Sequence, residues 1–128
     1  MNQLLAIVEQ GGYPNFTSLY TKLGYQVTMS HSMRKAMAIV RKQPPDVIVA
    51  EFNYQSDFRD RTSSLESLLA TVERIPRNTK SFIKVVVFYE KEYIQQLKKL
   101  QAVFSNFKTM AYPIEPNNLE KMLLDQQE

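Results

Sequence analysis

The chain has 128 residues, with 16 Lys and Arg, 13 Asp and Glu, one His and no Cys, and a formal net charge of +3. The length predicts one domain, and an apolar share of 44% is enough for a hydrophobic core. The lack of Cys excludes a disulfide framework, a thiolate metal site and a Cys nucleophile. A single His, His31, excludes a metal site with two His ligands.

The N-terminal segment carries no targeting signal. The apolar run Leu4–Val8 ends at Glu9, and no basic residue precedes it. This run is too short for a signal peptide and far shorter than the ~20 residues of a membrane helix. We therefore predict a cytoplasmic protein without membrane contact. The calculated pI of about 9.1 reflects scattered charges, so we do not expect nucleic acid as a partner.

Five short apolar runs lack helical spacing and predict β-strands: Leu4–Val8, Tyr25–Met29, Val47–Ala50, Ile83–Phe88 and Thr109–Ile114. The third and fourth runs are apolar at consecutive positions, which is typical of parallel strands covered on both faces. The second run alternates more and predicts a strand nearer the edge of a sheet.

Amphipathic segments between these runs predict helices. The first helix begins near Pro14 and ends at Gly24, a residue suited to a helix C-terminus. Ser32 is placed to cap the second helix, and Pro44-Pro45 ends it. Three further helices are expected at Ser63–Ile75, at Glu92–Phe104 and from Asn117 or Asn118. The core-facing residues of these helices are predicted to be Phe16, Leu19, Tyr20, Leu23, Met33, Ala36, Met37, Val40, Leu65, Leu68, Leu69, Val72, Ile94, Leu97, Leu100, Phe104, Leu119, Met122 and Leu123.

Strands that alternate with helices predict an α/β fold with a parallel sheet covered on both faces. The expected architecture is a three-layer, doubly wound (βα)5 sandwich of the flavodoxin-like type, formed by residues 1–128 as a single domain. Sites in such sheets lie at the carboxyl ends of the strands. Those ends are Glu9–Gly11, Ser30–His31, Glu51–Phe52, Tyr89–Glu90 and Tyr112–Pro113.

The segment from Ser32 to Glu51 resembles a response-regulator receiver domain of the chemotaxis-regulator type. Receivers have a second helix, then a Pro-Asp turn, then an apolar strand that ends in the phosphoacceptor Asp. Here Pro45-Asp46 forms the turn, and the strand ends in Glu51. The order of elements matches receivers over the whole chain, although the interval between Glu51 and Tyr89 is longer than usual.

The resemblance implies a degenerate acidic pocket. Receivers hold Mg²⁺ with two acidic residues after the first strand, and these positions are Glu9 and Gln10 here. Glu51 occupies the phosphoacceptor position with a side chain one methylene longer than Asp. We interpret Glu51 either as a fixed negative charge that holds one state of the domain or as a solvated acid without a switching role.

The remaining switch positions also depart from the receiver pattern. Tyr89 stands where receivers close the fourth strand with Thr or Ser, and Tyr112 replaces the Lys before Pro113. The switch aromatic of the fifth strand corresponds to Thr109. Tyr89 and Tyr112 are either a plug in the former phosphate pocket or simple strand-end aromatics. The resemblance implies a cis bond before Pro113, whereas trans is the default from sequence alone.

These substitutions predict a pseudo-receiver that acts without phosphorylation, as a protein–protein interaction module in signal transduction. We expect no enzymatic activity, catalytic residue, metal or cofactor. The partner is another protein or a second copy, bound by the surface of the fourth helix, fifth strand and fifth helix. Its candidate residues are Lys91, Gln95, Lys98 and Lys99, with Gln96 on the same outer face.

Three alternatives stay open at this point: an atypical phosphoacceptor, a flavodoxin-like small-molecule binder, and a nucleic-acid adaptor. Gly11-Gly12 lacks the spacing of a phosphate-binding loop and predicts a turn. His31 has no partner acid nearby in the sequence and predicts a loop residue. Asp57 and Asp60 suggest a solvated loop, or a recognition loop with Phe52, Tyr54 and Phe58 as exposed aromatics.

Overall fold

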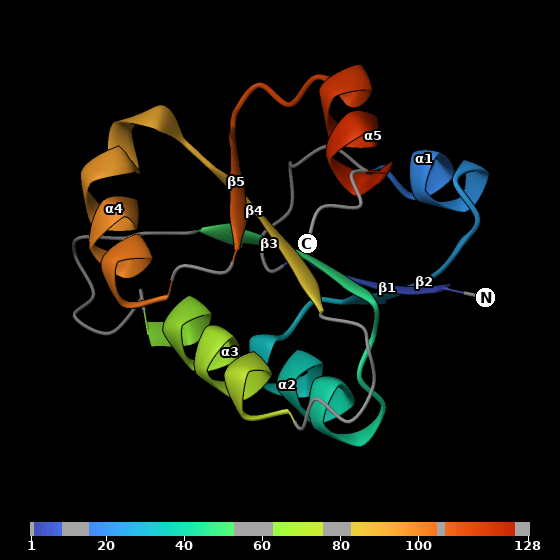
Figure 1. Ribbon diagram of the computed structural model, residues 1–128, viewed down its shortest axis with the longest axis horizontal. Coiled ribbons are helices and arrows are strands. Elements are labelled where there is room, and N and C mark those ends of the chain that lie inside the picture. Colours follow the sequence, from blue (N-terminus) through green and yellow to red (C-terminus); the bar gives the residue numbers. More distant parts are fainter. Residues whose placement is uncertain (1, 9–15, 53–62, 76–82, 105–106, 125–128) are drawn as a thin grey trace.

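The computed structural model describes residues 2–8, 16–52, 63–75, 83–104 and 107–124 (Figure 1). In chain order the elements are β1 (Asn2–Ile7), α1 (Thr17–Lys22), β2 (Tyr25–Ser30), α2 (Met33–Lys42), β3 (Val47–Phe52), α3 (Ser63–Arg74), β4 (Lys84–Tyr89), the 3₁₀-helix η1 (Lys91–Tyr93), α4 (Ile94–Val103), β5 (Lys108–Ala111) and α5 (Pro116–Leu124). The predicted alternation of strands and helices is confirmed.

The strands form one parallel five-stranded sheet in the order β2-β1-β3-β4-β5. The predicted edge position of the second strand is confirmed. All six residues of β3 are buried, as expected for a central strand covered on both faces. The strand order reverses direction at β1, so the carboxyl ends of β1 and β3 flank the point where doubly wound folds place their sites.

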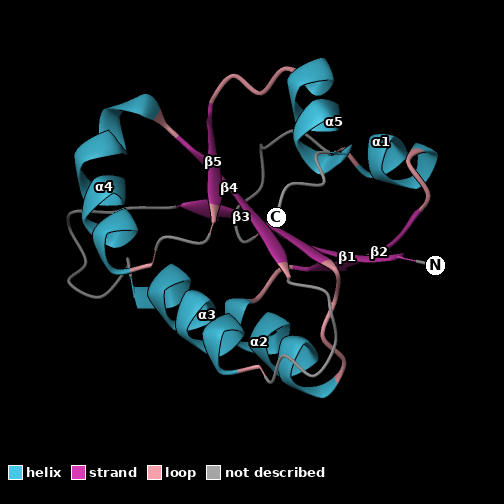
Figure 2. Ribbon diagram, viewed as in Figure 1, coloured by secondary structure: helices cyan, strands magenta, loops and turns pink. Residues whose placement is uncertain are grey.

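Helices cover both faces of the sheet and produce three layers (Figure 2). On one face, α2, α3 and α4 pack through residues such as Val40, Leu68 and Leu97. On the other face, α1 and α5 pack through Tyr20 and Leu119. The predicted α/β, doubly wound (βα)5 fold is therefore correct, and the apolar stripes of the helices are core-facing, as their spacing predicted.

Local signals in the sequence explain how two of the helices begin and end. Gly24 follows α1 with a φ of +95°, which is the left-handed conformation that glycine adopts without a steric penalty. The Ser32 hydroxyl accepts a hydrogen bond from the backbone N–H of Lys35 at 3.3 Å and so caps α2. This helix ends at Lys42, just before Pro44-Pro45, because a proline cannot continue it.

Several predicted boundaries were wrong. β5 ends at Ala111 rather than Ile114, and a cis peptide bond joins Tyr112 to Pro113. α5 begins at Pro116, one residue before the earliest predicted start, because proline is favoured in the first position of a helix, where its missing N–H has no role. The segment before α4 is a separate 3₁₀-helix rather than α-helix.

Within the described ranges, no helix is long and apolar enough to cross a membrane.

Candidate functional site

Glu51 is a buried acid near the end of the central strand β3. The residue is only 6% exposed, and it continues the row of alternate residues formed by Val47 and Val49. These two valines belong to the core under α1 and α5, so Glu51 lies on that face of the sheet. The interpretation of Glu51 as a solvated acid was therefore wrong.

The sheet register places an aromatic side chain next to Glu51. Glu51 pairs with Phe88 on β4, and paired residues of neighbouring parallel strands lie on the same face. Phe88 is 5% exposed and belongs to the core under α1 and α5. The neighbour of the buried carboxyl on β4 is thus an apolar ring.

Phe88 belongs to a cluster of aromatic rings on this face. Its centroid lies 6.1 Å from the ring of Phe16 and 5.9 Å from the ring of Tyr112, both in edge-to-face arrangements. Phe16 also contacts Tyr20, with centroids 6.5 Å apart. Burial raises the pKa of the Tyr20 phenol far above its ordinary value, which indicates an apolar environment. We call Phe16, Tyr20, Phe88 and Tyr112 the aromatic cluster.

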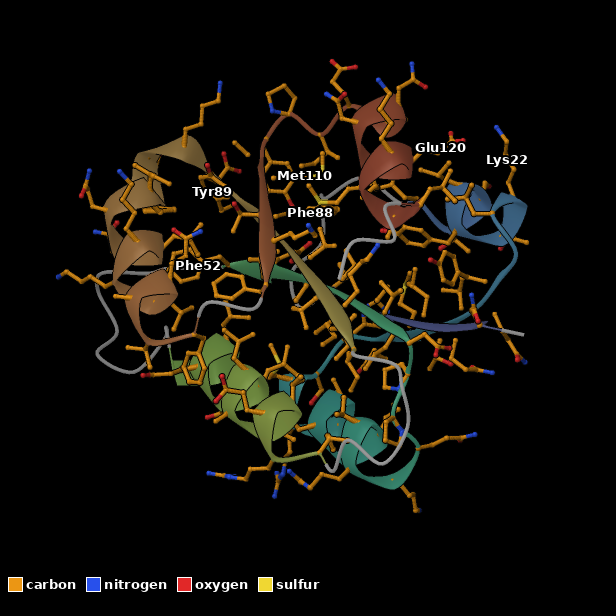
Figure 3. All side chains as sticks on the ribbon, viewed as in Figure 1. Lys22, Phe52, Phe88, Tyr89, Met110 and Glu120 are labelled. Atoms are coloured by element: carbon orange, nitrogen blue, oxygen red, sulfur yellow. The ribbon has the colours of Figure 1, made fainter. Side chains whose placement is uncertain are left out.

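Tyr89 lies on the opposite face from this cluster. It pairs with Phe52 in the register, and both pack with the core under α2, α3 and α4. Figure 3 shows Phe52 and Tyr89 on the α4 side of the sheet and Phe88 toward α5. The prediction that Tyr89 and Tyr112 fill one space was wrong, because neighbouring residues of a strand point to opposite faces. Phe52 is 3% exposed, so its prediction as an exposed aromatic was also wrong.

The position of the expected lysine lies just beyond β5. The Tyr112 backbone N–H donates to the carbonyl oxygen of Tyr89 at 2.9 Å, which continues the β4–β5 ladder by one residue. The peptide bond between Tyr112 and Pro113 is cis, as the resemblance implied. Thr109, the counterpart of the switch aromatic, pairs with Val87 and is half-buried.

His31 joins the ends of the first two strands. Its Nδ1 lies 2.9 Å from the carbonyl oxygen of Val8, and since a carbonyl only accepts, Nδ1–H is the donor. The side chain is exposed, as expected for a loop residue.

Part of the predicted site falls outside the described residues. Within the part of the chain that the structure describes, no group of three or more His, Cys, Asp and Glu side chains is arranged to hold a metal ion. The predicted residues outside that part are Glu9, Gln10, Gly11, Gly12, Tyr54, Asp57, Phe58 and Asp60.

The predicted interaction face on the fourth helix lies on the surface. Its four candidate side chains are all exposed: Lys91, Gln95, Lys98 and Lys99. Gln96 was wrongly assigned to this face, because it is half-buried and its Oε1 is buried without a hydrogen-bond partner among the described residues. The edge strand β5 is half-buried between α4 and α5 (Figure 1).

Sequence reasoning missed the contribution of Phe16 and Phe88 to the site. Phe16 was predicted as a core residue of the first helix, and Phe88 as the end of an apolar strand. The register between β3 and β4 decides which side chain lies beside Glu51. A shift of one residue in that register would place a different residue of β4 there. No pattern in the sequence fixes that register.

No protein-family model matches the sequence, and the comparison with curated proteins finds no match. Solved structures do match. A CheY-like response regulator receiver domain from Methylobacillus flagellatus superimposes with a TM-score of 0.70 at 22% identity, with 96% of each chain covered. The chemotaxis protein CheY4 of Vibrio cholerae gives a TM-score of 0.65 at 17% identity, again with 96% of each chain covered.

A third match is described as belonging to a family of redox sensors in the streptococci that evolved from two-component response regulators. It has a TM-score of 0.67 and 17% identity. The match covers 96% of this chain but only 49% of the streptococcal one, so the chain spans about half of that protein. Identities at this level establish the fold alone, and the fold is that of response-regulator receiver domains.

Proposed function

We propose that this chain is a pseudo-receiver that works without phosphorylation and whose output is the binding of a partner protein in signal transduction. The observation that carries the proposal is the burial of Glu51 beside Phe88. A phosphoacceptor has to be reached by its phosphodonor, and the burial of Glu51, which is 6% exposed, opposes the in-line approach of a phosphoryl group.

The residue chemistry supports the same proposal. Phosphoryl transfer to a carboxylate needs a divalent ion and a cation near the phosphoryl oxygens, because negative charge develops there. The position at which receivers place the lysine carries Tyr112, whose phenol is neutral at physiological pH. Tyr112 packs edge-to-face on Phe88, so its ring belongs to a hydrophobic cluster. The second of the two acidic positions is Gln10, an uncharged residue.

The comparison with the streptococcal redox sensors supports the idea that this fold takes on new roles. That protein is described as descended from response regulators. The present chain has no Cys, so it cannot sense redox changes through a cysteine thiol. A binding role needs no reactive side chain, and we therefore propose that the chain is not an enzyme.

We place the primary candidate interaction surface on α4, β5 and α5. The exposed side chains of Lys91, Gln95, Lys98 and Lys99 border this surface, and β5 is an edge strand with half-buried side chains. The occupant is a partner protein or a second copy of the chain.

The test is phosphorylation by a small acyl-phosphate donor in the presence of Mg²⁺, followed by intact-mass measurement at acidic pH. We expect no mass increase for the wild-type chain. A Glu51→Gln variant is the matched control, since it keeps the shape of the side chain and removes the acceptor. An increase of one phosphoryl group in the wild type that disappears in E51Q would overturn the proposal.

A further inference from the structure

One surface of the molecule carries charge of a single sign. Between Glu9 and Asp46 the sequence contains no acidic residue but five cations. Four of these belong to α2, and all four are exposed: Arg34, Lys35, Arg41 and Lys42. At 3.6 residues per turn they lie within an arc of about 120° along about 12 Å of helix. Ala38, also exposed, lies in the middle of this arc. We call these five residues the α2 basic face.

The fold does not explain this charge. No ion pair or other electrostatic contact joins the four cations to an acid in the described parts of the chain. Arg34 and Lys35 are in the first turn of α2, which has no acidic residue. The helix dipole is positive at that end, so each cation there is unfavourable by about 0.3–1 kcal/mol. A sequence shaped by stability alone would place Asp or Glu at these positions.

The other described helices lack such a face. α3 carries Glu66 in its first turn and Glu73 next to Arg74, and α5 carries Glu120 beside Lys121. The two lysines of α4 follow the acidic pair Glu90 and Glu92. In α3, in the segment of η1 and α4, and in α5, acids and cations therefore occur together, so none of these helices offers a second copy a purely acidic face.

We infer that the α2 basic face binds an acidic polypeptide segment of a partner protein, with the small Ala38 side chain allowing close approach of its backbone. The inference rests on the proposed function and names the chemistry of its partner. Nucleic acid fits less well, since α2 contains no aromatic residue on which bases can stack. In Figure 1, α3 lies between α2 and α4, so the α2 basic face extends the interaction role to a second surface.

The test uses a deca-glutamate peptide as the probe, titrated into ¹⁵N-labelled protein at low and physiological salt. We expect the largest amide shifts in α2, with affinity that falls as salt screens the charges. The variant R34E/K35E should weaken binding by about tenfold or more, because two attractive contacts become repulsive. The same substitutions should stabilise the helix, since they place acids in its first turn. Lost binding is then not a result of lost folding.

The matched control is K22E/R74E, which makes the same charge change at two exposed positions on α1 and α3 and should leave peptide affinity within about twofold. Equal loss in both variants would mean non-specific attraction and would overturn the inference. Tighter binding of an oligothymidylate of equal charge, or self-association through α2 in sedimentation, would also overturn it. Phosphorylation of Glu51 in the mass measurement would reject the proposed function and leave the peptide result unaffected.

Discussion

The Nζ of Lys84 donates a hydrogen bond to the carbonyl oxygen of Leu123 at 3.1 Å, and a second one to the carbonyl oxygen of Met122 at 3.0 Å. Lys84 is the first residue of β4, and the two carbonyls belong to the last turn of α5. The last carbonyls of a helix have no partner within the helix. A cation at this end also interacts favourably with the helix dipole, so Lys84 fastens α5 to the sheet.

Replacing Lys84 with Met should therefore loosen the end of α5. Hydrogen bonds from charged groups contribute about 1.5–3 kcal/mol, and partial exposure lowers this, so we expect a loss of about 1–2 kcal/mol. Urea unfolding measures the loss, and hydrogen exchange should localise it to α5. Lys121→Met removes an exposed charge from the same helix and should change stability by less than about 0.5 kcal/mol. Equal effects of both substitutions would contradict the anchoring role.

The contact between Phe88 and Tyr112 should be measurable as a coupling energy. Edge-to-face aromatic pairs contribute about 0.5–1.5 kcal/mol beyond the area that they bury, and these two rings are 5.9 Å apart. A double-mutant cycle with Phe88→Leu and Tyr112→Leu should give a coupling in that range. Val103→Ala serves as the control, because Val103 is 64% exposed and should cost less than about 0.5 kcal/mol. A coupling near zero would show that the aromatic cluster is not an energetic unit.

Tyr20 should make stability sensitive to alkaline pH. Burial raises the pKa of its phenol above the ordinary value of 10.0. The folded protein holds this proton more tightly than the unfolded chain. The contribution of this proton to the free energy of unfolding is therefore fully present below pH 10. It is lost as the pH rises through the folded-state pKa of Tyr20.

Urea unfolding at a series of pH values should show this loss in the wild type and a smaller loss in Tyr20→Phe. The phenolate absorbance of the wild type should rise together with unfolding. Parallel pH profiles for the two proteins would refute the assignment. Tyr25 contributes in the same direction, since burial and, to a lesser extent, the carboxylate of Asp46 raise its pKa.

The turn after α1 depends on the backbone conformation of Gly24. A Cβ at this position would meet no atom within 4 Å, but the φ of +95° is one that L-residues rarely adopt. Gly24→Ala should therefore cost about 1–2 kcal/mol through backbone strain alone. Gly24→Asn should cost less, because Asn tolerates this region better. If both variants are as stable as the wild type in urea unfolding, the turn does not require glycine.

The sequence determined the architecture because hydrophobic periodicity is a local property. Consecutive apolar residues at Val47–Ala50 identified a strand covered on both faces, and the polar alternation at Tyr25–Met29 identified an edge strand. Ser32 and Gly24 marked helix ends through interactions with residues close in the sequence. Such signals act within a few residues, so they are visible without the fold.

The neighbours of Glu51 were decided only by tertiary structure. Glu51 and Phe88 are far apart in the sequence, and they meet because β3 and β4 pair in one particular register. The same register sends Tyr89 to the opposite face, where it packs beside Phe52. Because side chains alternate along a strand, one residue of register decides whether Phe88 or one of its neighbours, Val87 or Tyr89, lies beside the buried carboxyl, and that choice is a property of the packed sheet as a whole.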